Sequence, residues 1–211
     1  MLGIVEPGDR AKVLASLTHD VESKGNVLTA GDVGFRYLLE ALALGDRSDL
    51  IYTLVNQDDK PGYGYQLKMG ATSLCESWDA NLTSSHNHFM LGQINEWFYK
   101  HLAGIGPDPG GAGFKKIMIR PQPVGDLAWA SYDSIHGTIV SSWKCDGQKF
   151  MLNIRIPANT TATVFLPAKP ADEVIENGNP AKQSEGVTFL RQEKEHAIFA
   201  VESGEYQFES R

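Results

Sequence analysis

The chain has 211 residues, of which 42% are hydrophobic and 21% charged, and its formal net charge is −7. This composition is typical of one or two folded domains and excludes a disordered or fibrous chain. Nucleic acid is bound through clustered Lys and Arg side chains, so an acidic chain without a basic cluster is not expected to bind it. No apolar run approaches the roughly 20 residues that cross a bilayer, so we expect no membrane segment.

Helical spacing of apolar residues dominates the first half of the chain. Apolar side chains recur three and four positions apart, which is the period of an amphipathic helix. The last such segment has Ser84 or Ser85 as a candidate N-cap and Gly104 as a candidate stop. The stripes are short and the loops between them are long, which favours a part of a larger helical array. The helical segments lie within residues 13–21, 37–42, 50–55 and 90–102.

The chain changes character at a Gly- and Pro-rich cluster, residues 106–113. Beyond it, apolar and polar residues alternate with the period of a strand, and Asp146-Gly147 and Asn177-Gly178 are typical turn sequences. Many short strands with regular turns predict an antiparallel sandwich. We therefore predict separate α and β domains, residues 1–110 and residues 111–211. The expected strands include residues 117–119, 138–143, 150–154, 163–166, 197–201 and 206–208.

The densest run of chemically useful side chains surrounds Glu76. Trp78 lies beside it, His86 and His88 follow, and Tyr63 lies in the preceding loop. In sugar hydrolysis a carboxylate activates water or attacks the anomeric carbon, and aromatic faces stack on the apolar faces of sugar rings. From residue types alone, Glu76 is more often a solvated surface residue and Trp78 a core residue. The two histidines are two positions apart, so on a helix at most one of them faces a given site.

Metal ligands are not evident in this run. A zinc site would need further ligands at suitable spacing, and the two cysteines, Cys75 and Cys145, fall in different predicted domains. We expect no metal, no cofactor and no disulfide.

The residues around Glu76 resemble a motif of the bacterial α-L-rhamnosidases, glycoside hydrolase family 78. Residues 70–79, Gly-Ala-Thr-Ser-Leu-Cys-Glu-Ser-Trp-Asp, are similar to that family's Gly-Ala-Thr-Thr-Ile/Leu-Trp-Glu-x-Trp. Cys75 replaces the tryptophan before the glutamate, which alters the pocket beside it. Other segments resemble the family in the same order: residues 29–34, 87–89, 92, 96–97, 103–105, 119–123, 137–140, 142–143 and 156–160.

The resemblance implies a fold and a reaction. The fold is an (α/α)6 catalytic barrel followed by a β-sandwich, of which this chain supplies the last helices and the sandwich. The reaction is hydrolysis of terminal α-L-rhamnose with inversion, with Glu76 as general base. His88 would contact the sugar, with His86 as the alternative. Tyr63 stands where the family often has a tryptophan near the sugar, and Trp78 belongs to the motif itself.

The resemblance also implies what is missing. The family's general acid comes from an earlier Asp/Glu-rich segment that has no counterpart here, so the chain alone is expected to be inactive. Its expected partners are a rhamnose-containing carbohydrate and the missing N-terminal part of the same polypeptide. The compartment stays open, and would be periplasmic or extracellular if that part carries a signal peptide.

Two other functions remain open. The sandwich could be a non-enzymatic packing or carbohydrate-binding module, with Trp129, Tyr132 and Trp143 as platform aromatics, although such residues more often fill the core. The helical half could instead belong to another (α/α)6-barrel glycosidase or lyase. The upstream sequence would distinguish the enzymes, and sugar binding by residues 112–211 would support the module.

Overall fold

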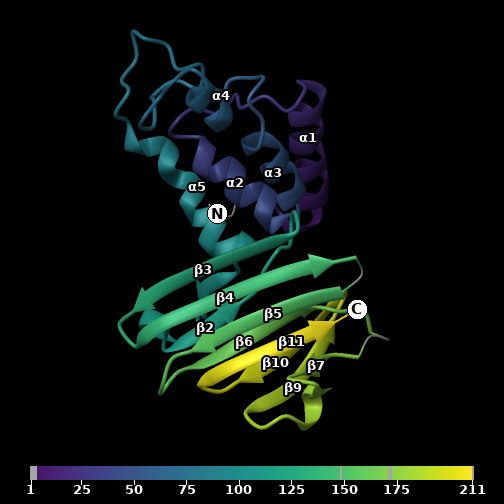
Figure 1. Cartoon of the computed structure of the whole chain (residues 1–211). Coiled ribbons are helices and arrows are strands. Elements are labelled where there is room, and N and C mark those ends of the chain that lie inside the picture. Colours follow the sequence, from purple (N-terminus) through teal and green to yellow (C-terminus); the bar gives the residue numbers. More distant parts are fainter. Residues whose placement is uncertain (1–3, 148, 171–172, 211) are drawn as a thin grey trace. The chain divides into compact units, whose positions relative to one another are not determined.

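The computed structural model describes residues 4–147, 149–170 and 173–210, and the chain forms two compact units (Figure 1). The first unit ends at Trp97 and is helical, and the second begins at Phe98 and is built mainly of strands. The predicted order of α before β is confirmed. The predicted domain boundary after residue 110 stays a prediction. In the structure, contacts group residues 98–110 with the strands.

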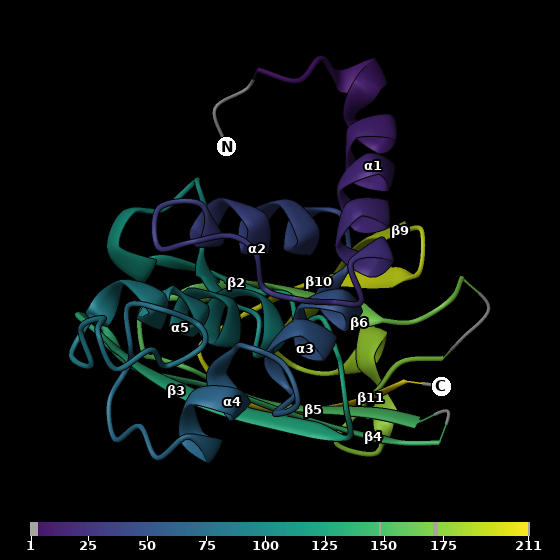
Figure 2. The ribbon, with the colours of Figure 1, turned by 90° about the horizontal axis from the view of Figure 1, so that it is seen from above.

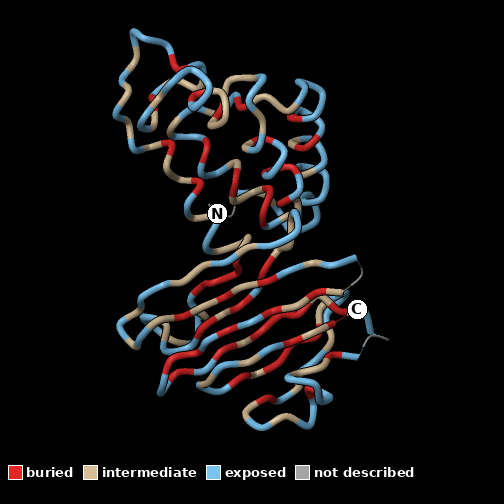
Figure 3. The backbone as a smooth tube through the Cα atoms, viewed as in Figure 1, coloured by how far each residue is buried: buried red, intermediate tan, exposed pale blue. Residues whose placement is uncertain are grey.

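The first unit is a small group of helices around α2 (Phe35–Leu44), which contacts its neighbours α1, α3 and α5 (Figure 2). The apolar stripe of α2 is buried, including Phe35 and Leu42. In α1, Val21 is buried but Val13 is 48% exposed, so much of its stripe is open (Figure 3). The other helices are η1 (Pro7–Asp9), α1 (Arg10–Ser23), α3 (Ser48–Val55), α4 (Tyr63–Lys68), η2 (Phe89–Gln93) and α5 (Ile94–Trp97).

The expected start of the last helical segment is wrong. His88, rather than Ser84 or Ser85, is the N-cap of η2, because the preceding residues are held in a loop by backbone hydrogen bonds. The expected stop is confirmed, since Gly104 has a φ of 81° and follows the π-helical segment η3 (Phe98–Leu102). In the part of the chain that the structure describes, no helix is both long and apolar enough to span a membrane.

The second unit contains two sheets. One has the strand order β1-β2-β6-β10-β9, and the other β3-β4-β5-β11-β7-β8. The pairings are antiparallel except for β2 with β6. Asn177 and Gly178 have φ of 46° and 85°, as a two-residue hairpin requires. The strands are β1 (Ile105–Pro107), β2 (Lys116–Ile119), β3 (Leu127–Ser134), β4 (Gly137–Asp146), β5 (Lys149–Ile156), β6 (Thr161–Pro167), β7 (Ile175–Glu176), β8 (Asn179–Pro180), β9 (Val187–Glu193), β10 (His196–Val201) and β11 (Gly204–Ser210).

One hydrophobic core joins the two sheets face to face. It contains Val164 and Phe199 from the first sheet and Leu152 and Phe208 from the second, and the rings of Phe199 and Phe208 lie 6.1 Å apart. The expected sandwich is confirmed, and Trp143 is buried in it as the core preference predicts.

The core preference is wrong for Trp129. Its side chain is 66% exposed, because strand alternation turns it to the face opposite the core. Tyr132 is 41% exposed, and its ring packs against Phe114 at 4.8 Å between centroids.

Candidate active site

Glu76 lies in an irregular loop of residues 71–88 that folds back on itself. The Glu76 N–H donates to the Ser85 carbonyl at 2.8 Å, and the His88 N–H donates to the Leu74 carbonyl at 2.9 Å. The Ser73 hydroxyl also donates to the carbonyl of His86. These bonds hold the two halves of the loop side by side without a regular helix or strand.

The Glu76 side chain is exposed and is oriented from the same loop. Its Oε2 accepts the Ser85 N–H at 3.2 Å, so one backbone and one side-chain hydrogen bond join the two residues. An exposed carboxylate fixed by one backbone bond is accessible to water and has further lone pairs to accept from it.

Gln66 in α4 binds the backbone on either side of Glu76. Its Nε2 donates to the Ser77 carbonyl at 3.0 Å, and its Oε1 accepts the Cys75 N–H at a longer 3.4 Å. Gln66 is 3% exposed, so the buried amide uses its donor and its acceptor on the loop. Sequence reasoning missed this residue, since nothing in its surroundings marks it.

Cys75 is fully buried, and burial raises the pKa of its thiol. A thiol of this kind stays protonated and packs as a small apolar side chain. The residue that departs from the family motif therefore lies inside the unit.

Tyr63 and Trp78 are brought together, as the sequence suggested, in a cluster with Phe35. Ring centroids lie 5.1 Å apart for Tyr63 and Trp78, and 5.0 Å apart for Phe35 and Trp78, in edge-to-face contacts. Trp78 Nε1 donates to the Ala30 carbonyl at 2.8 Å, and the Tyr63 hydroxyl donates to the Leu91 carbonyl. Burial raises the pKa of Tyr63, so its hydroxyl remains a donor.

From the sequence, Tyr63 is expected to lie in a loop, and this expectation is wrong. It begins the helix α4 instead of lying in a loop. Its ring is therefore placed by a regular element, while Trp78 is placed by the loop.

The two candidate histidines have different surroundings. His86 Nε2 lies 3.1 Å from the Asn81 carbonyl, at the surface side of the loop. His88 Nε2 lies 3.5 Å from Asp32 Oδ2, and this buried nitrogen has no hydrogen-bond partner among the described residues. Gln93 Nε2 donates to the Asp32 carbonyl at 2.8 Å, and its Oε1 is likewise buried and unpartnered within the described part of the chain.

The surroundings of Asp32 therefore hold polar atoms that lack partners. Buried polar atoms are nearly always paired, so His88 Nε2 beside the Asp32 carboxylate and the Oε1 of Gln93, whose Nε2 binds the Asp32 backbone carbonyl, are exceptions to that rule. The sequence contained Asp32 only as one letter of a matching segment and did not single it out. Across residues 4–147, 149–170 and 173–210, no cluster of three or more His, Cys, Asp or Glu side chains suited to a metal ion is found.

Comparison with known proteins identifies the family of the chain. Residues 1–102 match the model of the bacterial α-L-rhamnosidase 6 hairpin glycosidase domain, and residues 104–180 match that of the bacterial α-L-rhamnosidase C-terminal domain. The chain belongs to the bacterial α-L-rhamnosidase family. The fold class expected from the resemblance, the last helices of an (α/α)6 barrel followed by an antiparallel β-sandwich, is confirmed by the match to the six-hairpin domain and by the sheets that follow it.

Curated relatives carry the same name. An α-L-rhamnosidase of Streptomyces avermitilis is 34% identical over 199 residues, which are 89% of this chain and 18% of that protein. An α-L-rhamnosidase of Formosa agariphila is 27% identical over 206 residues, 92% of this chain and 22% of that protein. The chain thus spans about a fifth of the length of these curated relatives.

Solved structures of rhamnosidases share the fold. The α-L-rhamnosidase of Dictyoglumus thermophilum matches with a TM-score of 0.87 and 30% identity, over 100% of this chain and 24% of that one. The Streptomyces avermitilis α-L-rhamnosidase complexed with L-rhamnose matches with a TM-score of 0.86 and 32% identity, over 98% of this chain and 20% of that one.

Proposed function

We propose that the chain is part of an inverting glycoside hydrolase that removes terminal α-L-rhamnose from glycosides or polysaccharides, with Glu76 as its general base. The observation that carries the proposal is the exposed Glu76 carboxylate, oriented by the Ser85 N–H in a loop that matches the family's glutamate motif. A related enzyme that matches 98% of this chain was solved with L-rhamnose, which supports the choice of sugar.

The chemistry requires two carboxyl groups on opposite sides of the sugar. Glu76 takes a proton from water, the water oxygen bonds to the anomeric carbon, and the bond to the aglycone oxygen breaks. A second carboxylic acid protonates that leaving oxygen. In inverting enzymes the two groups stand ~6.5–9.5 Å apart, which leaves room for the water. We assign the acid to a part of the parent polypeptide outside these residues.

Residues near Glu76 have defined roles in this proposal. His88 contacts the sugar, and Asp32, whose Oδ2 lies 3.5 Å from His88 Nε2, holds the imidazole in place. Trp78 and Tyr63 form the aromatic wall that supports this side of the pocket, since their rings and polar atoms are already engaged. His86, bound to the Asn81 carbonyl, is the less suitable of the two histidines.

Exposed apolar side chains in the first unit support an incomplete barrel. Val33, Leu82 and Phe89 are 72%, 90% and 83% exposed. Side chains this large and apolar are available for contact with another part of a protein. We propose that the rest of the parent polypeptide covers them and supplies the acid, so that the chain alone is inactive.

An assay with an aryl α-L-rhamnoside tests the proposal on two proteins. The full-length parent should hydrolyse it, and proton NMR should show the β-anomer of rhamnose as the first product, because inversion converts α to β. The chain of 211 residues should give no turnover, since one half of the acid–base pair is absent. First release of the α-anomer, or turnover by the chain alone that Glu76→Gln abolishes, would contradict the proposal.

A further inference from the structure

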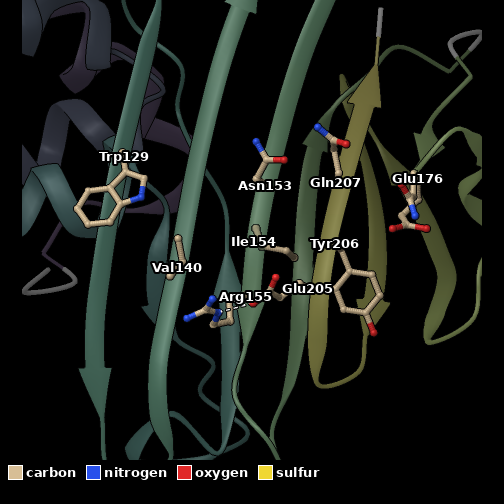
Figure 4. Close-up of a pocket in the computed structure, with 10 residues that line it drawn as sticks. Trp129, Val140, Asn153, Ile154, Arg155, Glu176, Glu205, Tyr206 and Gln207 are labelled. Carbon is tan, nitrogen blue, oxygen red and sulfur yellow. Dashed lines mark hydrogen bonds and ion pairs between the residues drawn. The ribbon is translucent and has the colours of Figure 1, made fainter.

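The outer face of the sheet β3-β4-β5-β11 carries a hollow of about 500 Å³ that the proposed hydrolysis does not use (Figure 4). The inner side chains of this sheet, such as Leu152 and Phe208, are buried against the other sheet. Side chains at the alternate positions therefore point outward. Trp129 from β3 and Asn153 from β5 lie on this outer face and line the hollow.

The strand register places the outward residues in two rows. In the first row, Trp129 pairs with Ser142, Ser142 with Asn153, and Asn153 with Gln207. Directly opposite residues of antiparallel strands share a face, with Cβ atoms about 4.5–5.5 Å apart. Three strand spacings of about 4.8 Å give the row a length of roughly 14 Å, which is longer than a single pyranose ring.

The second row runs beside the first, and its two charged side chains form an ion pair. Val140 pairs with Arg155, and Arg155 pairs with Glu205. Arg155 Nε donates to Glu205 Oε1 at 2.7 Å, so the guanidinium and the carboxylate neutralise one another. Neither row offers an unpaired cation to an anionic ligand, and the chain as a whole is acidic.

The side chains of the first row suit a neutral sugar chain. Trp129 is 66% exposed, so its indole is available to the apolar face of a sugar ring. The amides of Asn153 and Gln207 are exposed, and each offers both a donor and an acceptor to hydroxyl groups. The row therefore combines an apolar ring with polar amides, and a pyranose likewise combines an apolar ring face with hydroxyl groups.

We propose that this outer face is a second carbohydrate-binding site, which holds a neutral rhamnose-containing oligosaccharide along the row from Trp129 to Gln207. That the ligand contains rhamnose rests on the proposed function. That the ligand is neutral and stacks on an aromatic ring follows from the side chains of this sheet face. The site would retain a carbohydrate chain while its terminal rhamnose is removed elsewhere.

The test titrates an oligosaccharide of α-linked L-rhamnose into the chain of 211 residues by isothermal titration calorimetry. The wild-type chain should bind, and the Trp129 indole N–H resonance should shift in a parallel NMR titration. Trp129→Ala should weaken binding about tenfold or more, because the aromatic platform of the row is removed. Trp129→Phe should retain most of the affinity, which separates loss of the platform from loss of folding.

Leu127→Ala is the matched control, since Leu127 is also on β3, points to the same face and is also 66% exposed. It should bind like the wild type, as should Glu76→Gln. No binding at millimolar sugar, equal loss in Leu127→Ala, or unchanged binding in Trp129→Ala would overturn the proposal. Binding that Glu76→Gln abolishes and Trp129→Ala preserves would place the sugar in the first unit, which supports the proposed function and overturns the second site.

Discussion

Gln66 shows how one buried amide can position a catalytic loop. Its two polar ends bind the backbone at Cys75 and Ser77, so the residue between them, Glu76, has both neighbours fixed. The Cys75 contact is long and contributes less than the Ser77 bond. A buried group that loses its partner keeps its desolvation cost, which is what makes such a residue difficult to replace.

Gln66→Leu should therefore lower the free energy of unfolding by about 1–3 kcal/mol, because the Ser77 carbonyl and the Cys75 N–H lose their partner. Urea unfolding of the chain of 211 residues measures this change. Gln183→Leu, at an exposed position, is the control and should change stability by less than about 0.5 kcal/mol. Equal effects of the two substitutions would show that Gln66 does not hold the loop.

Single residues of the site were predictable from sequence only where a motif contains them. Glu76, Trp78 and His88 lie in segments that match the family. Gln66 binds an irregular loop, where no periodicity signals a contact. Asp32 lies in the matching segment 29–34, but its contact with His88 joins residues that are distant in sequence. Trp129 was expected in the core by residue type, and only the register of β3 with β4 places it outside.

At the scale of elements, the joint between η3 and β1 depends on Gly104. Its φ is 81°, and an added Cβ would lie 2.2 Å from the Pro121 N and 2.4 Å from the Arg120 carbonyl carbon. The Arg120 N–H donates to the Gly104 carbonyl at 2.9 Å, so the two backbones must lie this close. Only glycine combines this φ with so close an approach at low cost.

Gly104→Ala should lower the free energy of unfolding by more than Gly178→Ala does. Gly178 has a similar φ of 85° but no atom within 4 Å of an added Cβ. In both variants an alanine must adopt the left-handed conformation, which costs about 1–2 kcal/mol of stability. Only Gly104→Ala adds a clash with the backbone, which costs about 1–3 kcal/mol more. Denaturant unfolding of both variants measures the difference, and equal losses would argue against a close approach at Gly104.

The long central strands were predictable from the sequence, and the edge strands were not. Strands such as β5 and β6 alternate buried and exposed residues or are continuously apolar, and both patterns are visible in sequence. The missed strands are β1, β3, β7, β8 and β9, and all of them except β7 form an edge of a sheet. An edge strand has fewer neighbours to bury it, so its pattern is weaker; in β3 no residue is buried.

At the scale of the whole molecule, the two units differ in how fully they bury their apolar side chains. The sandwich has a continuous core that both sheets share. The helical unit leaves α1 largely exposed, with Val13 at 48%, and shows Leu82 and Phe89 at its surface. The short stripes and long loops of the sequence already indicated a part of a larger array. The helices that we propose to cover this unit could not be derived from these residues, because they would lie outside them.

Replacing Glu76 in the full-length parent enzyme tests the central claim most directly, with sodium azide added to the assay. Glu76→Ala should lower kcat by roughly 10²–10⁴-fold, because the attacking water loses its base, while circular dichroism stays unchanged. Azide needs no base, so it should restore turnover and yield β-L-rhamnosyl azide, with none formed by the wild type. A near-wild-type rate without azide, or an azide product of α configuration, would contradict the assignment of Glu76 as the general base.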